Sequence, residues 1–235
     1  MSQRLLVTAV AALLFTATLG AIAGQEKSVR PGINDTFQSP DLKEWVTKFE
    51  GENRENFAKR KEIVAACKIE PGMTVADVGV GTGLFTRLFS SAVGEKGTVY
   101  ANDLSPKFLE HIAARAKEMK LANVKTVLGQ PADARLPEGT VDLAFVCDVY
   151  HHFEYPHKML ASIFKSLKPG GRLIVIDFVR DASTRDPWIL QHVRAGQNVV
   201  EKEILSAGFQ KANEVEGLLR ESYMIVFQKP AAEAK

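Results

Sequence analysis

Short β-rich runs alternate with helical segments through most of the chain after Pro71. The expected strands are residues 75–80, 98–102, 124–128, 141–147, 173–178, 215–219 and 223–227, and the expected helices are residues 84–93, 105–120, 156–167 and 199–207. Residues 141–147 are almost entirely apolar, as in a strand buried on both faces. This alternation predicts βαβ units, and so an α/β fold built on a mostly parallel sheet.

The composition indicates a single soluble-type domain with short extensions. The chain has 235 residues, with 30 basic and 28 acidic side chains and a formal net charge of +2. So weak a charge does not favour a protein that binds nucleic acid through bulk charge. The two cysteines, Cys67 and Cys147, are too few for a disulfide-rich scaffold or a four-thiolate metal site. Both lie in apolar patterns and are expected to be buried.

The first 23 residues have the pattern of a secretory signal peptide. A short basic start is followed by an apolar run from Leu5 to Gly20 and by the small residues Ala21-Ile22-Ala23. We therefore expect export, to the periplasm if the source is bacterial, with cleavage after Ala23. An uncleaved membrane anchor is the main alternative because the apolar stretch nearly spans a bilayer, and a buried N-terminal helix is another.

Two segments precede the first expected strand. Residues 24–40 contain prolines, glycines and small polar residues, and are expected to form a linker. Residues 41–68 have helical spacing. Trp45, Phe49, Glu50 and Arg54 in this region can form a lid over a site, although core packing explains the aromatic residues equally well.

The most informative motif is Asp-Val-Gly-Val-Gly-Thr-Gly at residues 77–83, where a strand meets a helix. Glycines at such a turn allow a ligand to approach the backbone closely. The spacing departs from G-x-G-x-x-G, because Leu84 and Thr86 stand where the last glycine is required, and this argues against a dehydrogenase. The sequence also lacks the G-x-x-x-x-G-K-[ST] motif that binds nucleoside triphosphates.

A carboxylate ends the second expected strand. Asp103 lies 20 residues beyond Gly83, where an acid can accept hydrogen bonds from both ribose hydroxyls of an adenosine. The alternative is a purely local role at the start of the next helix.

Together these residues resemble the class I S-adenosylmethionine-dependent methyltransferases. The resemblance covers about residues 63–229, within an expected domain of residues 41–235, and rests on residues 77–83, Asp103, residues 130–134, 142–153 and 167–171. It implies S-adenosylmethionine as cofactor. It also implies a Rossmann-like seven-stranded sheet, mostly parallel, with helices on both faces and an antiparallel last strand at residues 223–227.

The resemblance also implies roles for individual residues. The glycine loop would wrap the methionine and ribose, Asp103 and the adjacent Leu104 would hold the ribose, and Asp133 and Ala134 would face the adenine amino group. Asp148, at the end of a strand, would lie near the methyl group. The expected cofactor-binding residues are thus Asp77, Gly79, Gly81, Thr82, Gly83, Asp103, Leu104, Asp133, Ala134 and Asp148.

The segment after the strand at residues 141–147 is expected to face the methyl acceptor. His151 or His152 is the candidate general base, with Tyr150 beside them, although a histidine here can also simply pack or cap. Adjacent histidines can bind a metal, but no third ligand stands at a recognisable spacing, so no metal site is expected. Residues 191–197, which include His192, either bind an acceptor carboxylate or phosphate or form a plain surface loop.

The closest resemblance within the family is to small-molecule and quinone-type methyltransferases. The Asp/Asn-Pro-Pro-aromatic tetrad of members that methylate nucleic-acid amines is replaced here by Asp-Val-Tyr-His at residues 148–151, so no nucleic-acid partner is expected. We therefore expect methyl transfer to a small-molecule or lipid-like acceptor, with membrane contact only through an uncleaved leader. The rival hypothesis is an exported, non-catalytic domain that binds the cofactor or another ligand. No feature of the sequence assigns an oligomeric state.

Overall fold

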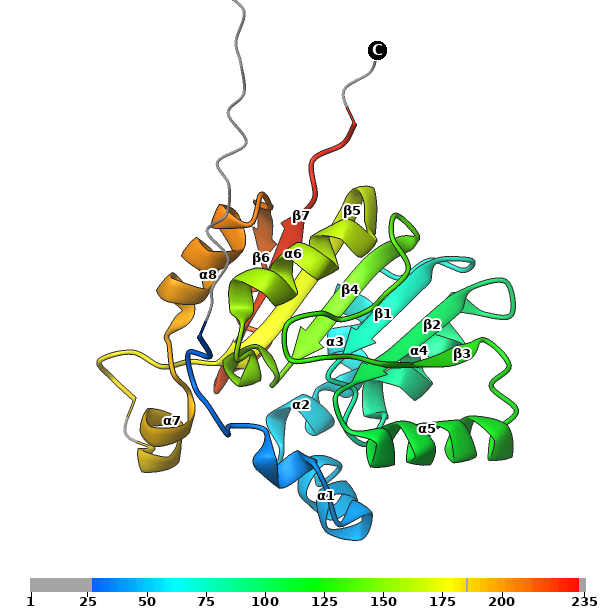
Figure 1. The fold of residues 1–235 in the computed structure, drawn as a ribbon, viewed down its shortest axis with the longest axis horizontal. Helices are drawn as coiled ribbons and strands as arrows, with labels where there is room; N and C mark the ends of the chain where they lie inside the picture. Colours follow the sequence, from blue (N-terminus) through cyan, green and yellow to red (C-terminus); the bar gives the residue numbers. More distant parts are fainter. Residues whose placement is uncertain (1–26, 185, 233–235) are drawn as a thin grey trace, which may run out of the picture.

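The protein is described from a computed structural model, which covers residues 27–184 and 186–232. The predicted signal peptide, residues 1–23, lies outside the described residues. Seven strands form one sheet in the order β3-β2-β1-β4-β5-β7-β6 (Figure 1). Their bounds are Thr74–Val78 (β1), Thr98–Asp103 (β2), Val124–Leu128 (β3), Val141–Cys147 (β4), Leu167–Phe178 (β5), Gln210–Glu214 (β6) and Ser222–Gln228 (β7).

Only β7 runs against the other strands. The pairs β1–β2, β1–β4, β2–β3 and β4–β5 are parallel, whereas β7 is antiparallel to both β5 and β6. The predicted seven-stranded, mostly parallel sheet with an antiparallel last strand is confirmed.

Helices cover both faces of the sheet (Figure 1). On one face, α3 (Arg60–Ala66) and α4 (Leu84–Val93) bury Ile63, Phe85 and Phe89 against β1, β2 and β4, while α5 (Pro106–Glu118) packs beside them on β2 and β3. On the other face, α6 (Pro156–Ser166) and α8 (Gln197–Ser206) bury Leu160 and Ile204 against the sheet. The strands between these layers are buried on both sides, which explains their continuous apolar sequence.

Two expected boundaries are wrong. The last strand pair uses β6, not residues 215–219, because β6 is an exposed edge strand that carries no apolar pattern. Val215 and Leu219 instead pack against the core from the β6–β7 connection. The strand expected at residues 173–178 begins earlier, at Leu167, as β5, which is irregular at its start: Gly170 has φ +76°, and the register against β4 shifts between Val141 and Leu143.

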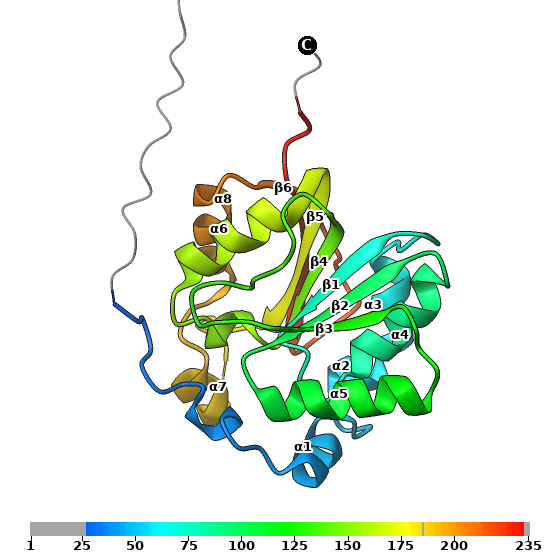
Figure 2. The same cartoon turned by 45° about the vertical axis from the view of Figure 1, so that its right-hand side comes forward.

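The N-terminal region lies across the carboxyl ends of the strands (Figure 2). It contains a 3₁₀ turn, η1 (Asp35–Phe37), followed by α1 (Leu42–Phe49) and α2 (Glu55–Ala58). The Asp41 side chain starts α1 by accepting hydrogen bonds from the N–H groups of Lys43 and Glu44. Within the described residues, no helix is long and apolar enough to cross a membrane.

Candidate functional site

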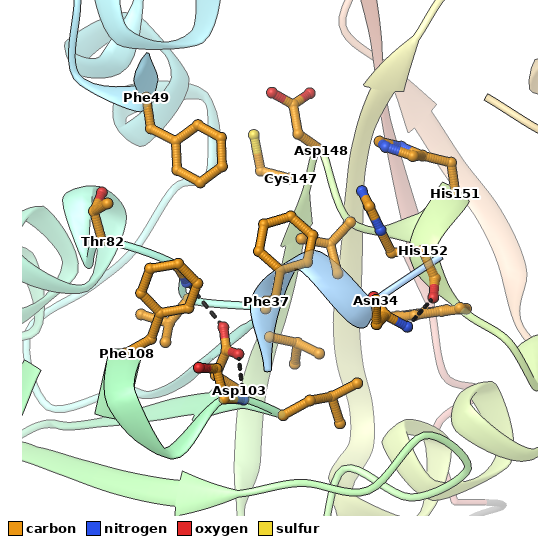
Figure 3. A pocket seen from close by; sticks show the side chains of 18 of the residues that line it. Asn34, Phe37, Phe49, Thr82, Asp103, Phe108, Cys147, Asp148, His151 and His152 are labelled. Carbon is orange, nitrogen blue, oxygen red and sulfur yellow. Dashed lines mark hydrogen bonds between the residues drawn. The ribbon is translucent and has the colours of Figure 1, made fainter. Parts of the chain in front are cut away.

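A cavity of about 570 Å³ lies at the carboxyl ends of β1, β2 and β4 (Figure 3). One wall is the glycine loop, residues 79–82, and the opposite side carries Asp148, His151 and His152. The N-terminal region contributes Phe37, Trp45, Phe49 and other side chains. Ligand pockets typically measure about 300–1,000 Å³ and lie at this edge of open α/β sheets.

The glycine loop turns sharply above β2. The N–H groups of Gly79 and Val80 both donate to the Asn102 carbonyl, at 2.8 and 3.0 Å. Gly79 has φ +75°, and a Cβ there would lie 2.5 Å from both methyl groups of Val149. Glycine is therefore required by conformation and by space. At Gly81 a Cβ would face Phe49 at 3.5 Å, so the cavity reaches the backbone at this point.

Asp103 joins this loop to the end of β2. Its Oδ2 accepts from the Gly81 N–H at 3.0 Å, and its Oδ1 accepts from the Ser105 N–H at 2.8 Å. Burial raises the pKa of Asp103, while these N–H groups oppose that rise. The hydrogen bond from the Ser105 N–H is the alternative, local role of Asp103 at the start of the next helix. Each carboxylate oxygen nevertheless retains a lone pair, and Asp103 lines the cavity. Asp103 can thus also receive ligand hydroxyls.

The other loop residues divide into two groups. Thr82 and Leu104 line the cavity, whereas Gly83 begins α4 with φ +81° and lies against Ile112. Asp77 lines the cavity but is buried, and its Oδ2 accepts from the Thr86 hydroxyl at 2.6 Å. Burial raises the pKa of Asp77 to about 7.

Besides Gly83, three of the expected site residues do not line the cavity. Asp133 is exposed, and its carboxylate accepts from the Arg135 N–H at 2.8 Å. Ala134 is buried, and its carbonyl accepts from the Asn102 side chain at 2.8 Å. Their neighbours Gly129, Gln130 and Pro131 line the cavity instead.

Tyr150 is the third of these residues. It is fully buried, and its hydroxyl donates to Glu203 at 2.8 Å. Arg194 pairs with the same carboxylate at 2.6 Å, so Tyr150 belongs to a structural network behind the cavity wall. Polar residue type alone could not distinguish it from its neighbours His151 and His152.

Asp148 follows β4 directly and has φ +55°. Its Oδ2 pairs with the Arg54 guanidinium at 2.5 Å, and its buried Oδ1 has no hydrogen-bond partner among the described residues. Burial raises its pKa, and Arg54 opposes that rise. The adjacent Cys147 also lines the cavity, with a thiol pKa raised by burial.

Three histidines meet beside Asp148. Asp177, at the end of β5, accepts from the His151 backbone N–H at 3.0 Å and lies 2.7 Å from His151 Nδ1. His192, from α7 (Pro187–His192), places its Nε2 3.2 Å from His152 Nε2. Burial lowers the pKa of His152 to about 2 and that of His192 to about 4, so both rings are neutral at pH 7. No spacing in the sequence marks His192 as the third member, since 40 residues separate it from His152.

Comparison with known proteins gives this cavity a context. Residues 76–175 match a family described as "Methyltransferase domain". The chain is 34% identical over 109 residues to the ubiquinone/menaquinone biosynthesis C-methyltransferase UbiE of Vibrio vulnificus, which covers 46% of this chain and 42% of that protein. It is 27% identical over 124 residues to a demethylmenaquinone methyltransferase of Geobacillus, with 53% of each chain covered. The chain therefore spans about half the length of the curated relatives it matches.

Among solved structures, an S-adenosylmethionine-dependent methyltransferase of Aquifex aeolicus superposes with a TM-score of 0.70 at 25% identity, covering 81% of this chain and 99% of that one. A sarcosine dimethylglycine methyltransferase structure from Galdieria sulphuraria gives a TM-score of 0.62 at 12% identity, a likeness of fold alone. The fold is thus that of S-adenosylmethionine-dependent methyltransferases, and S-adenosylmethionine is the implied cofactor.

The residues present fit that cofactor. The Asp103 carboxylate at the cavity wall suits ribose hydroxyls, and Gly79 and Gly81 of the glycine loop line the same cavity without side chains. Leu104, next to Asp103 in sequence, and Gln130 also line the cavity, and Figure 3 shows Asp148, His151 and His152 across it from Asp103. The cavity therefore has one end suited to the nucleoside and another suited to the acceptor.

Proposed function

We propose that this chain, which carries a methyltransferase domain of the class I S-adenosylmethionine-dependent type, transfers a methyl group to a small-molecule acceptor at the histidine end of its cavity. One observation carries the proposal: the glycine loop with Asp103 and the buried His151–Asp177 pair line or adjoin the same cavity. In this proposal, a wall suited to a nucleoside lies opposite groups that can take up a proton.

The bound cofactor supplies an activated methyl group on a sulfonium centre, so the protein mainly has to position the reactants and exclude water. Asp103 and the glycine loop fix the nucleoside. The N-terminal region encloses the cavity with Phe37, Trp45 and Phe49, whose rings pack in series at centroid distances of 4.9 Å. Water exclusion by these rings would strengthen the polar interactions of the acceptor.

The N-terminal region is tied to the rest of the domain at the connection between α1 and α2. Glu50 pairs with Arg87 of α4 at 2.6 Å, and Arg54 pairs with Asp148. These contacts support a lid function for residues 41–68, which can open only when the ion pairs separate.

His151 is suited to accept a proton from the acceptor. The Asp177 carboxylate at Nδ1 favours the tautomer with the hydrogen on that nitrogen, which leaves the Nε2 lone pair free. In this scheme the acceptor O–H, N–H or C–H proton moves to Nε2 and Asp177 stabilises the resulting imidazolium. Asp177 acts through His151 as a positioning residue.

The acceptor end favours a flat or lipid-like molecule. Phe178, Trp188 and the histidines supply aromatic walls there, with Trp188 stacked on His192 at 4.5 Å. The curated relatives that are named as quinone methyltransferases support an acceptor of this kind. The leader sequence supports export of the chain, with the membrane anchor as the alternative outcome of a localisation experiment.

The test is transfer of labelled methyl groups from S-adenosylmethionine to a panel of quinols, phenols, amines and phospholipids. We expect transfer to at least one class. His151→Gln should lose most of the transfer rate while keeping cofactor affinity, and His157→Gln on α6 is the matched control. A chain that binds the cofactor but methylates no panel member would instead favour the non-catalytic binding domain.

A further inference from the structure

We propose that His151, His152 and His192 bind a divalent transition-metal ion of the zinc class at the acceptor end of the cavity. The three histidines come from η2 (Tyr150–His152) and α7, two elements that meet only in the folded chain. The proposal concerns metal binding and is tested without reference to methyl transfer. Because Asp177 occupies Nδ1, a metal on His151 would take the Nε2 lone pair, so metal binding and proton uptake at this nitrogen are alternative states.

The geometry is that of a three-histidine site. One ring nitrogen from each histidine lies within 4.8 Å of the others. With zinc–nitrogen bonds of about 2.1 Å, two ligands of a tetrahedral site lie about 3.4 Å apart. The Nε2 atoms of His152 and His192 are already 3.2 Å apart, and the His151 ligand atom lies within 4.8 Å of both ligand atoms.

The surroundings of the cluster match those of metal-binding histidines. Such a histidine usually donates its second N–H to a carboxylate or carbonyl, which fixes the tautomer. Asp177 does this for His151 at 2.7 Å. Trp188 stacks on His192 at 4.5 Å with an interplanar angle of 19°, and Phe37 packs edge-on to His152 at 5.3 Å. The rings are therefore held in place from outside the cluster.

Charge and protonation also favour a cation. A neutral imidazole is the form that binds metal, and the 3.2 Å contact between the Nε2 atoms of His152 and His192 requires a lone pair on at least one of them. Asp177 adds a negative charge behind His151, while Asp148 neutralises Arg54. A hydrogen bond between His152 and His192 pairs only those two rings. One cation accepts a lone pair from each of the three rings.

Three protein ligands leave a fourth position, which is typical of catalytic rather than structural zinc sites. All three histidines line the cavity, so this position faces the space assigned to the acceptor. An acceptor oxygen, nitrogen or sulfur atom, or a water molecule, would occupy it.

The test is a titration of the metal-free, untagged full chain with Zn²⁺ by calorimetry and with Co²⁺ by visible absorption, which reports tetrahedral coordination. We expect one equivalent to bind. His192→Ala should weaken binding by at least about tenfold and remove the tetrahedral Co²⁺ bands. Asp177→Asn should weaken binding about 10–100-fold. His157→Ala, which changes a histidine outside the cluster, should bind as the parent does.

His192 is partly exposed on a short helix, so its variant retains the buried core and keeps the test interpretable. The parent chain failing to bind either metal, or His192→Ala binding as tightly as the parent, would overturn the proposal. Equal losses in His192→Ala and His157→Ala would do the same, since they would indicate non-specific binding. None of these outcomes depends on finding a methyl acceptor.

Discussion

The Arg54 guanidinium and the Asp148 carboxylate form an ion pair at 2.5 Å across 94 residues of sequence. The pair joins the N-terminal region to the end of β4. There Asp148 has φ +55°, and its buried Oδ1 has no hydrogen-bond partner among the described residues. It connects the covering region of the cavity with the wall that carries the histidines.

Removing Arg54 should therefore destabilise the fold. In Arg54→Met, Asp148 remains buried without a cation, which we expect to cost about 1–3 kcal/mol of unfolding free energy in urea titrations. Arg54→Met combined with Asp148→Asn should recover part of this loss. Lys165→Met, which breaks an exposed pair with Glu138, is the control and should change little. Equal effects of the two single variants would contradict this role.

The pH dependence of stability should reveal Asp77. Burial raises its pKa in the folded chain to about 7 from a usual value of 3.8. The folded state thus holds a proton that the unfolded state has lost, so this group makes the unfolding free energy fall as pH rises from about 4 to 7. One proton corresponds to a slope of at most about 1.4 kcal/mol per pH unit.

Asp77→Asn retains an acceptor for Thr86 and removes the titration, so urea unfolding across this pH range should show a flatter profile. The parent and the variant share all other buried carboxylates, such as Asp103, so the difference between their two pH profiles comes from Asp77. A variant profile that overlays the parent profile, or falls more steeply with pH, would rule out the elevated pKa.

Glycines with similar backbone angles should differ in their tolerance of alanine. At Gly79 an added methyl group would lie 2.5 Å from Val149, at Gly81 it would meet Phe49 at 3.5 Å, and at Gly72 it would meet nothing within 4 Å. Gly72→Ala then measures the backbone cost alone, about 1 kcal/mol. We expect Gly81→Ala to be similar and Gly79→Ala to lose clearly more in thermal unfolding. The same loss at all three positions would show that packing against Val149 is unimportant.

Asp103 and Asp133 provide a matched comparison for cofactor binding. Asp103→Asn keeps one oxygen to accept from the Gly81 or the Ser105 N–H, turns its amide NH2 toward the other and loses the charge, which should weaken S-adenosylhomocysteine binding about 10–100-fold. Asp133→Asn, on an exposed residue outside the described lining of the cavity, should bind as the parent does. Calorimetry measures both, and the reverse order of affinities would support the adenine-binding role that the family resemblance implied for Asp133.

The centre of the sheet was predictable because the strands there are buried on both faces. The almost entirely apolar residues 141–147 predict a buried strand, and β4 has those bounds. The edge strand β6 was missed because its side chains are exposed, so burial imposes no pattern on them. The short helices of the N-terminal region follow helical spacing, but their position over the cavity depends on distant partners such as Asp148 and Arg87.

The site was predictable where local chemistry determines it. The glycine loop and Asp103 are joined through backbone groups at a strand end, and their spacing indicated this arrangement. His192 was not recognisable as a partner of His152, since tertiary contacts alone bring α7 to η2. Tyr150 was predicted to lie beside the acceptor. In the structure it belongs to a 3₁₀ turn in which its hydroxyl donates to Glu203, while His151 and His152 line the cavity.

The most direct test of the account is calorimetric titration of the full chain with S-adenosylhomocysteine and S-adenosylmethionine. The arrangement of Asp103 and the glycine loop predicts one equivalent of each ligand, with an affinity that Asp103→Asn lowers. Absence of binding of both ligands at about 1 mM, the concentration that corresponds to roughly 4 kcal/mol of binding free energy, would contradict it.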